Sequence, residues 1–411
     1  MIEKKTIWIF NQYCSTPESG FHNRHFYLAT ELAKLGHKVY VFSASYSHIQ
    51  SNPVQFEGEI KIESFEENFK FVWIKVPSYE SSKNKRRIMN WIEFAWKISR
   101  IGRFIEDKPD VILYSSLSLI GFLGAERLAK QYKVPLIFEV RDIWPLTIVE
   151  LGGYSKSHPF IRFLQWVEDR AYQKSTKVIS NLKYSINHMV QRGLNPEKFH
   201  WIPNGFYAGA VESSQELPDS ILQLIPDDKF IVGYTGSIGT ANCLSNLVEA
   251  AIKFKNDERY FFIIVGKGEF KSTLEDMVKV NGLKNILILN PIPKKQIPSM
   301  LEKFDACYIG LSHDPVFKYG VSPNKLFDYF LAAKPIIYAI DSGEYTPVKD
   351  ADCGVEIQPE DSSQIVKAIE KISVLSVQQR EIMGENGYKY GKENHDYEVL
   401  AKKLNKILFF N

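Results

Sequence analysis

Residues 321–329 read Val-Ser-Pro-Asn-Lys-Leu-Phe-Asp-Tyr, and this stretch predicts the start of a helix. Ser322 suits the N-cap and Pro323 suits the first helical position. The free backbone N–H groups and the positive dipole end at such an N-terminus favour an anion. A well-capped surface helix with solvated charges would look similar, so the function of this stretch depends on its context.

Three polar side chains lie on one face of this helix: Asn324, Lys325 and Asp328. Residues three and four apart are neighbours on a helix, and at about 1.5 Å rise per residue Asp328 lies about 6 Å deeper than the start. Lys325 adds a positive charge near the free amides. The spacing predicts a nucleotide site, with a diphosphate at the amides and ribose hydroxyls at the Asp328 carboxylate.

Length and composition limit the possible classes of protein. A chain of 411 residues favours two domains, and a net charge of +3 is too small to indicate a nucleic-acid partner. The four cysteines are scattered without paired or metal-binding spacing, which favours a reducing compartment. No secretory leader precedes the strand-like residues 6–10, and no uncharged apolar run reaches the roughly 20 residues that span a bilayer. We therefore expect a cytoplasmic protein, with attachment to the inner face of the cell membrane left open.

Both halves of the chain alternate strand and helix patterns, which predicts α/β architecture with parallel sheets and helices on both faces. The expected strands of the first half are residues 6–10, 38–43, 72–76, 111–114, 136–140 and 177–180, and its helices are 24–35, 87–106, 119–131 and 160–174. The expected strands of the second half are residues 230–234, 260–265, 286–289, 306–310 and 336–340, with helices at 244–254, 270–280, 296–303 and from 322.

This pattern predicts two doubly wound, Rossmann-like domains. The polar stretch 205–228 suits the boundary, so the expected domains are residues 1–207 and 208–385, and helix 386–411 is expected to return to the first domain. Ligands of open parallel sheets bind at the carboxyl ends of the strands. We therefore expect the site in a cleft between two facing sheets.

Two glycine-containing loops follow strands of the second domain. Gly236, Ser237 and Gly239 lie where a backbone approaches a phosphate ahead of a helix, although an ordinary tight turn is equally compatible. Lys267 follows the next strand, within reach of a diphosphate or else solvated in a turn.

Charged residues end two strands of the first domain. Gly20 would allow close approach of a ligand. Arg24 opposes the dipole at a helix start, so we expect an acidic or phosphorylated ligand beside it unless it is simply solvated. Glu139, Arg141 and Asp142 end another strand, where Asp142 would orient or deprotonate an acceptor hydroxyl. A structural ion pair between Arg141 and Asp142 is the alternative.

A basic, aromatic-rich helix is expected from Lys83 to Arg100, with Trp91 and Trp96 on it. Such helices can lie on anionic membranes, although core packing explains most of the apolar face. No Gly-x-Ser-x-Gly, Walker loop or zinc-type spacing is present, which disfavours hydrolases, NTPases and metalloenzymes.

Residues 320–337, Gly-Val-Ser-Pro-Asn-Lys-Leu-Phe-Asp-Tyr-Phe-Leu-Ala-Ala-Lys-Pro-Ile-Ile, resemble the family 4 glycosyltransferases, which are retaining enzymes of the GT-B fold. The resemblance extends over nearly the whole chain, including the segments around Gly20 and Arg24, residues 142–145 and residues 202–205. It is greatest to the branch that transfers N-acetylated amino sugars, such as N-acetylfucosamine, in O-antigen and capsule assembly.

The resemblance implies a donor site in the second domain. The family has two glutamates eight residues apart; the second aligns with Asp328 on the ribose, and the first falls on Gly320, which has no side chain. Backbone amides of residues 320–322 would then contact the sugar, and Lys325 or Lys267 would replace a basic pair missing from the loop at Gly236. The donor-binding residues expected are Gly236, Ser237, Gly239, Lys267, Pro291, Gly320, Val321, Ser322, Asn324, Lys325 and Asp328, with Pro291 beside the base.

The implied reaction is transfer of a sugar, an N-acetylated hexosamine or deoxyhexosamine, from UDP to a glycan or lipid-diphosphate acceptor with retention of configuration. Lys325 and the helix start would stabilise the departing diphosphate without a metal, and Asp142 would act on the acceptor. The acceptor-binding residues expected are Gly20, Arg24, Glu139, Arg141 and Asp142. Two alternatives remain: a non-hydrolysing UDP-sugar epimerase of the GT-B fold, or a non-catalytic nucleotide-sugar-binding subunit, suggested by Gly320.

Overall fold

The computed structural model describes residues 3–20, 23–48, 50, 52–79, 86–208 and 214–410. The chain forms two compact units. The first comprises Met1–Pro203 and Tyr397–Asn411, and the second comprises Asn204–Asp396. The sequence alone predicted the corresponding junctions after residues 207 and 385, so the second junction lies eleven residues later in the structure.

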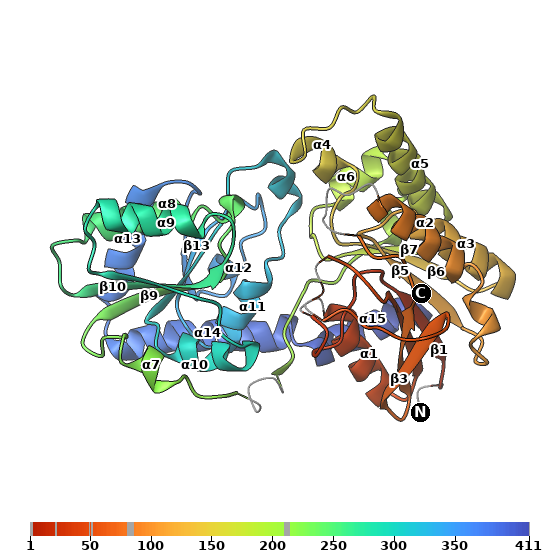
Figure 1. The fold of residues 1–411 in the computed structure, drawn as a ribbon, viewed down its shortest axis with the longest axis horizontal. Coiled ribbons are helices and arrows are strands. Elements are labelled where there is room, and N and C mark those ends of the chain that lie inside the picture. The colour runs from red at the N-terminus through yellow and green to blue at the C-terminus, as the bar shows by residue number, and fades with distance from the viewer. Residues whose placement is uncertain are drawn as a thin grey trace. The chain divides into compact units, whose positions relative to one another are not determined.

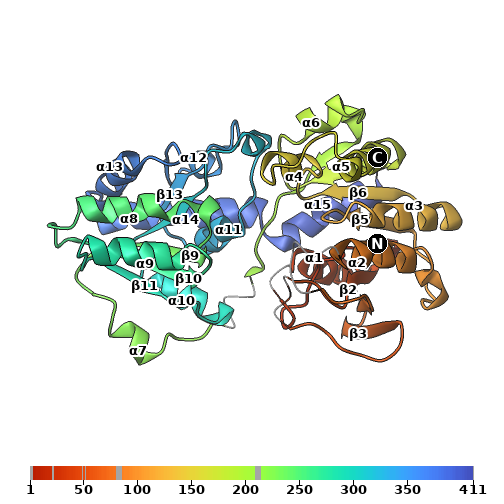
Figure 2. The ribbon, with the colours of Figure 1, turned by 45° about the horizontal axis from the view of Figure 1, so that its top comes forward.

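The first unit contains an eight-stranded sheet in the order β3-β4-β2-β1-β5-β6-β7-β8 (Figure 1). Its strands are β1 (Thr6–Phe10), β2 (Lys38–Ala44), β3 (Ile60–Glu66), β4 (Phe69–Ile74), β5 (Val111–Ser115), β6 (Leu136–Val140), β7 (Lys177–Ser180) and β8 (Phe199–Trp201). Its helices are α1 (Arg24–Lys34), α2 (Arg86–Ile98), η1 (Ile101–Arg103), α3 (Gly121–Tyr132), α4 (Leu146–Glu150), α5 (Pro159–Lys174), α6 (Ile186–Gln191), η2 (Pro196–Lys198) and α15 (Tyr397–Phe409). The C-terminal helix α15 packs beside α1, as Figure 2 also shows.

Strand β3 departs from the expected all-parallel sheet, because it pairs antiparallel with β4. It lies at the sheet edge, and most of its side chains are exposed. Buried parallel strands are continuous apolar runs, whereas an antiparallel edge strand needs only one apolar face. The mixed sequence Ile-Lys-Ile-Glu-Ser-Phe-Glu therefore gave no strand signal.

The second unit contains a parallel six-stranded sheet in the order β11-β10-β9-β12-β13-β14. Its strands are β9 (Phe230–Ser237), β10 (Tyr260–Lys267), β11 (Ile286–Leu289), β12 (Ala306–Gly310), β13 (Ile336–Ala339) and β14 (Gly354–Glu356). Its helices are α7 (Asp219–Leu222), η4 (Thr240–Asn242), α8 (Leu244–Lys253), α9 (Lys271–Val280), η5 (Lys294–Gln296), α10 (Ile297–Glu302), η6 (Pro315–Tyr319), α11 (Asn324–Leu331), α12 (Pro347–Asp350), α13 (Ser362–Ser373) and α14 (Val377–Asn394).

Two apolar layers cover the two faces of the second sheet. One layer contains buried residues of α8, α9 and α13, and the other contains buried residues of α10 and α11 (Figure 1). Neighbouring β9 residues alternate between them, with Ile231 in the α11 layer and Val232 in the α8 layer. This burial on both faces is what a doubly wound parallel sheet requires. It fixes α11 on one face, with its first turn near the carboxyl ends of the strands.

Helix α14 supports α11 through a row of glycines. A Cβ on Gly391 would lie 3.0 Å from Phe330 Cβ, and one on Gly384 would lie 1.9 Å from the carbonyl oxygen of Ala333. Residues 386–394 of the helix predicted over 386–411 therefore belong to α14, which packs on α11 by close backbone approach and lies in the second unit. Within the described residues, no helix has the length and apolar content to cross a bilayer.

Candidate functional site

The first turn of α11 differs from the predicted cap. The helix begins at Asn324, Pro323 occupies the N-cap position, and no side chain caps the helix. The prediction that Ser322 is the N-cap is wrong, because its hydroxyl oxygen accepts the backbone N–H of Asn204 at 3.2 Å instead. Asn204 Nδ2 also donates to the Ser322 carbonyl oxygen at 3.1 Å. Asn204 thus holds the segment before α11 and leaves the first helical amides without a side-chain acceptor.

The Lys325 side chain lies against the end of β9. Its Nζ donates to Asn242 Oδ1 at 3.1 Å and lies 4.9 Å from the centre of the Tyr234 ring. Gly236 has a φ of 144°, and a Cβ there would lie 2.9 Å from Lys325 Cε. Gly236 therefore provides both the backbone conformation and the space that bring Lys325 to this strand end. Burial lowers the pKa of Lys325 to about 8, although the charge of Asp328 opposes this shift.

Two further residues of this cluster were missed in the sequence. The Tyr234 hydroxyl donates to the carbonyl oxygen of Ser237 at 2.6 Å and lies 3.1 Å from Asn242 Oδ1. Asn242 lies in the loop after Gly236, from which the expected basic pair is missing. Its place between a strand end and the start of α8 was the available signal, since such loops border ligand sites in parallel sheets.

Asp328 lies one turn further along α11 and is partly exposed. Burial raises the pKa of its carboxyl group to about 6, against the charges of Lys294 and Lys325. Lys294 belongs to η5, which follows the exposed Pro291. A carboxylate with a raised pKa beside a lysine with a lowered pKa is typical of a functional site.

The expected glycine loops are largely strand ends. Gly236 pairs with Gly266, and Ser237 pairs with Lys267, across β9 and β10. A Cβ on Gly266 would lie 1.8 Å from the Gly236 carbonyl oxygen. Close approach between the two strands therefore explains Gly266.

The other predicted donor-binding residues differ in their exposure and in their contacts. The side chain of Lys267 is exposed, and no hydrogen bond or ion pair holds its ammonium group within the described chain. Gly239 lies directly before η4 with an ordinary φ of −106°. The Val321 side chain is buried in the apolar layer under α11, so only its backbone can face a ligand. Asn324 is exposed, and its Oδ1 lies 3.4 Å from Asn204 Nδ2.

Gly320 has a backbone conformation that explains its residue type. Its φ is 94° and its ψ is 156°, a region that glycine occupies without strain and other residues do not. The resemblance aligned this position with a glutamate. A glutamate here would require either strain or a different backbone path between η6 and α11.

In the first unit, Arg24 and Glu139 are buried and bonded to each other. Arg24 Nε donates to Glu139 Oε1 at 3.1 Å, and Arg24 also donates to the carbonyl oxygens of Ile202, at 2.9 Å, and Pro203. Both side chains are at most 3% exposed. Glu139 therefore explains an arginine at the start of α1 without a ligand. The alternative prediction that Arg24 is solvated is wrong, because its side chain is buried.

His25 completes this buried network, although no role was predicted for it from the sequence. Its Nε2 lies 2.6 Å from Glu139 Oε2, and its Nδ1 lies 2.9 Å from Asn11 Nδ2. An amide donor at Nδ1 places the proton of a neutral imidazole on Nε2, facing the carboxylate. Burial lowers the pKa of His25 below its usual value. Burial alone would raise the pKa of Glu139, but the surrounding His25 and Arg24 groups hold it well below its usual range.

Arg141 contrasts with Arg24. Its Nε and Nη1 are buried and have no acceptor among the described residues, while its backbone N–H donates to Ser116 Oγ at 3.3 Å. Asp142 is exposed, and no ion pair joins it to Arg141 in the part of the chain that the structure describes. The structural ion pair considered for these two residues is therefore wrong.

Gly20 is buried and lies close to the loop that follows β1. A Cβ there would lie 3.2 Å from both Cβ and Oγ of Ser15. Packing against Ser15 therefore explains this glycine within the described residues, and the adjacent residues 21 and 22 lie outside them.

Comparison with known protein families covers both units. Residues 20–207 match the model described as "Glycosyltransferase Family 4", and residues 220–390 match the one described as "Glycosyl transferases group 1". The chain belongs to the family 4 glycosyltransferases.

Relatives of this family 4 glycosyltransferase include the Escherichia coli K12 protein described as "Putative colanic acid biosynthesis glycosyl transferase WcaI", which is 26% identical over 210 residues. That match spans 49% of this chain and 50% of the relative. Solved structures share the GT-B fold over the whole chain. Anabaena HepE in complex with UDP and glucose gives a TM-score of 0.65 at 15% identity, covering 98% of this chain and 99% of that one. WaaG, a glycosyltransferase involved in lipopolysaccharide biosynthesis, gives 0.64 at 17% identity, covering 99% and 100%.

The basic helix of this glycosyltransferase divides into a buried face and an exposed face. Residues 83–85 of the expected segment lie outside the described residues, and α2 begins at Arg86. Trp91 is buried, and its Nε1 donates to the Tyr13 hydroxyl at 2.6 Å. Trp96 is half exposed, with the guanidinium of Arg100 3.9 Å from its ring centre. Trp91 therefore packs in the interior of the first unit, whereas Trp96 lies at its surface.

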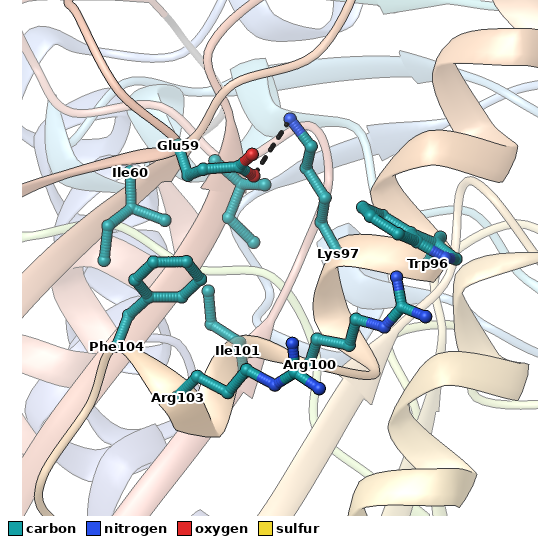
Figure 3. Close-up of a pocket in the computed structure, with 9 residues that line it drawn as sticks. Glu59, Ile60, Trp96, Lys97, Arg100, Ile101, Arg103 and Phe104 are labelled. Carbon is teal, nitrogen blue, oxygen red and sulfur yellow. Dashed lines mark ion pairs between the residues drawn. The ribbon is translucent and has the colours of Figure 1, made fainter.

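A small pocket of about 120 Å³ lies beside the end of α2 (Figure 3). Arg100, Arg103 and Phe104 line it together with the Glu59–Lys97 ion pair, whose N–O distance is 3.4 Å. It lies at the β3–β4 edge of the first sheet, and β2, β1 and β5 separate β4 from β6, the strand that Arg141 and Asp142 follow. Among the described residues, no group of three or more His, Cys, Asp or Glu side chains is arranged to hold a metal ion.

Proposed function

We propose that this glycosyltransferase transfers a sugar from a UDP-sugar to a glycan or lipid-linked acceptor, with retention of anomeric configuration. The arrangement of Lys325 and Asp328 at the start of α11 carries this proposal. Lys325 and the uncapped amides form a positive pole, and Asp328 supplies an acceptor for hydroxyls one turn away. HepE, which shares the fold, is described in complex with UDP and glucose, and this supports UDP as the nucleotide.

The diphosphate would bind at the α11 amides and Lys325, with Gly236, Ser237 and Gly239 beside it. The ribose would bind at Asp328, the base near Pro291, and the sugar near the backbone of residues 320–322. As the bond from the anomeric carbon to the diphosphate oxygen breaks, negative charge grows on the leaving group. Lys325 and the helix dipole would stabilise that charge, and such preorganised stabilisation is commonly the largest catalytic contribution.

The acceptor would bind to the first unit near Arg141 and Asp142. The exposed Asp142 carboxylate would orient the acceptor hydroxyl or take its proton as the new glycosidic bond forms. The buried Arg24–Glu139–His25 network would hold this strand end in shape. The products are UDP, the extended acceptor and a proton.

The biological setting we propose is surface polysaccharide assembly of the O-antigen or capsule type, with an N-acetylated hexosamine or deoxyhexosamine as the sugar. The names of WcaI and WaaG, which refer to colanic acid and lipopolysaccharide, support this setting.

We also propose that α2 attaches the protein to an anionic membrane. Met89, Ile92 and Trp96 form one exposed apolar stripe at helical spacing, with exposed fractions of 59%, 46% and 50%. Arg86, Arg100 and Arg103 add positive charge around it, which suits anionic headgroups. Flotation with vesicles containing anionic lipid should recover the protein, and Trp96→Ala should reduce recovery. Equal recovery with neutral vesicles would contradict the proposed attraction.

The donor assignment is tested by titrating UDP-, GDP- and TDP-sugars against the full chain and its Asp328→Ala variant. UDP-sugars should bind, and Asp328→Ala should weaken them by about 10- to 100-fold, as expected for lost hydrogen bonds to a charged group. Asp276→Ala is the matched control, because Asp276 is exposed on α9. Unchanged affinity in Asp328→Ala would contradict the ribose assignment.

A non-catalytic nucleotide-sugar-binding subunit is the second candidate, favoured by the glycine at position 320. Labelled UDP-sugars incubated with lipid extracts distinguish the two. Binding without any transfer of label to lipid would support the subunit. Formation of an epimeric UDP-sugar without an acceptor would instead indicate an epimerase.

A further inference from the structure

Arg141 is the feature of the first unit that the network around it does not explain. Its Nε and Nη1 are shielded from solvent and lack an acceptor among the described residues. Buried donors almost always have partners, and a shielded cation without one is unfavourable. Glu139 Oε1 accepts a hydrogen bond from Arg24, and Glu139 Oε2 lies 2.6 Å from His25 Nε2. The guanidinium therefore has hydrogen-bonding capacity that the folded chain leaves unused.

Other unused polar atoms lie on the neighbouring segment. Ser116 Oγ accepts the Arg141 backbone N–H, which joins the end of β6 to the segment that follows β5. Ser115, the last residue of β5, and Ser118 of the following segment have buried Oγ atoms that also lack partners among the described residues. The same segment leads into α3, a helix of 12 residues whose N-terminus has no side-chain cap. Donors and a positive helix end thus gather at the carboxyl ends of two adjacent strands.

The charges around Arg141 favour the binding of an anion. Arg24 Nε bonds to Glu139 Oε1, burial lowers the pKa of His25, and the His25 and Arg24 groups hold the pKa of Glu139 well below its usual range. The positive charges of Arg24 and Arg141 both lower the pKa of Glu139, so two buried or half-buried cations share this one buried carboxylate. A guanidinium with hydroxyl donors nearby suits a phosphate ester, whose several oxygens accept hydrogen bonds at once.

We propose that Arg141, together with the segment that holds Ser115 and Ser118, binds a phosphate or diphosphate group of the acceptor. This inference rests on the proposed function, since it specifies the chemistry of the acceptor for that reaction. The acceptor is recognised through its anionic group at Arg141, while Asp142, the next residue, is exposed for the hydroxyl that receives the sugar. Arg141 is a binding and positioning residue in this arrangement.

The test is a titration of the full chain with four probes while UDP saturates the donor site: inorganic pyrophosphate, glucose 1-phosphate, farnesyl diphosphate and glucuronate. Arg141→Met should weaken the phosphate probes at least tenfold, and Arg141→Lys should recover part of the loss. Arg127→Met is the matched control, because Arg127 is exposed on α3. Farnesyl diphosphate binding more tightly than pyrophosphate would indicate a lipid-linked acceptor, and similar affinities would indicate a soluble phosphorylated one.

Equal affinities in Arg141→Met and Arg127→Met, or Arg141-dependent binding of glucuronate alone, would overturn the inference. A loss of thermal stability in Arg141→Met with phosphate affinity intact would show a structural role instead. The outcome is separable from that of the proposed function. UDP binding without phosphate binding refutes only the inference, whereas Arg141-dependent phosphate binding without UDP binding refutes only the donor assignment.

Discussion

The strand-end polar clusters of the two units differ in how fully they satisfy their own charges. In the first unit, Arg24, His25 and Glu139 form a buried network in which the cation and the carboxylate bond to each other. In the second, Lys325 contacts a neutral amide and the Tyr234 ring, and the Asp328 carboxylate has no hydrogen bond or ion pair within the described residues. We infer that the first cluster stabilises the fold, whereas Lys325 and Asp328 of the second cluster remain able to bind a ligand.

The largest expected effect comes from breaking the closed network. Glu139→Ala would leave Arg24 buried without its carboxylate, which should lower the free energy of unfolding by about 3–5 kcal/mol. Urea unfolding would measure it. Glu106→Ala, at an exposed position of the first unit, should change stability by less than about 0.5 kcal/mol. A loss of UDP affinity without a loss of stability in Glu139→Ala would reverse the comparison.

A smaller effect is expected at the edge of the second cluster. Gly320→Ala should destabilise the protein by about 1–3 kcal/mol, because alanine must adopt a φ of 94° and a ψ of 156° there. Gly239→Ala is the control, since its φ is −106° and the nearest atom to a new Cβ, Asn242 Nδ2, is 3.6 Å away. Comparable melting temperatures for the two variants would show that position 320 tolerates a side chain.

Sequence patterns predicted the fold well where strands are buried on both faces. Strands β1, β6, β7, β11 and β12 have the expected bounds, because continuous apolar runs distinguish such strands. The edge strand β3 and the three-residue strands β8 and β14 lack that signal and were missed. The predictions of the GT-B fold and of family 4 are confirmed.

The candidate site was harder to predict, because partner choice depends on contacts distant in sequence. Ser322 accepts a hydrogen bond from Asn204, which is 118 residues away in sequence, and so does not take its expected capping role. Asn242 accepts a hydrogen bond from Lys325, which is 83 residues away. Arg24 finds Glu139 across 115 residues. Periodicity predicts the helix or strand on which a residue lies. It does not show which distant side chain forms a hydrogen bond or ion pair with that residue.

The pH dependence of UDP affinity tests the charges assigned to Lys325 and Asp328 in the second unit. The pKa of Asp328 is about 6, so its carboxylate is lost as the pH falls through that value, and the pKa of Lys325 is about 8, so its charge is lost as the pH rises through that value. UDP affinity should therefore be highest between about pH 6 and pH 8 and fall on either side. Asp328→Ala should remove the acidic fall. A profile that stays flat from pH 5 to pH 9 would contradict the assigned charges.

The most direct test of the donor site is the UDP affinity of Lys325→Met compared with that of Lys267→Met. Both changes remove one positive charge near the end of β10, but only Lys325 lies against Gly236 and the first turn of α11. We predict that Lys325→Met weakens UDP by about 10- to 100-fold, as for a lost charge-assisted hydrogen bond, and that the exposed Lys267 contributes less than about threefold. Wild-type UDP affinity in Lys325→Met would contradict the placement of the donor diphosphate at α11.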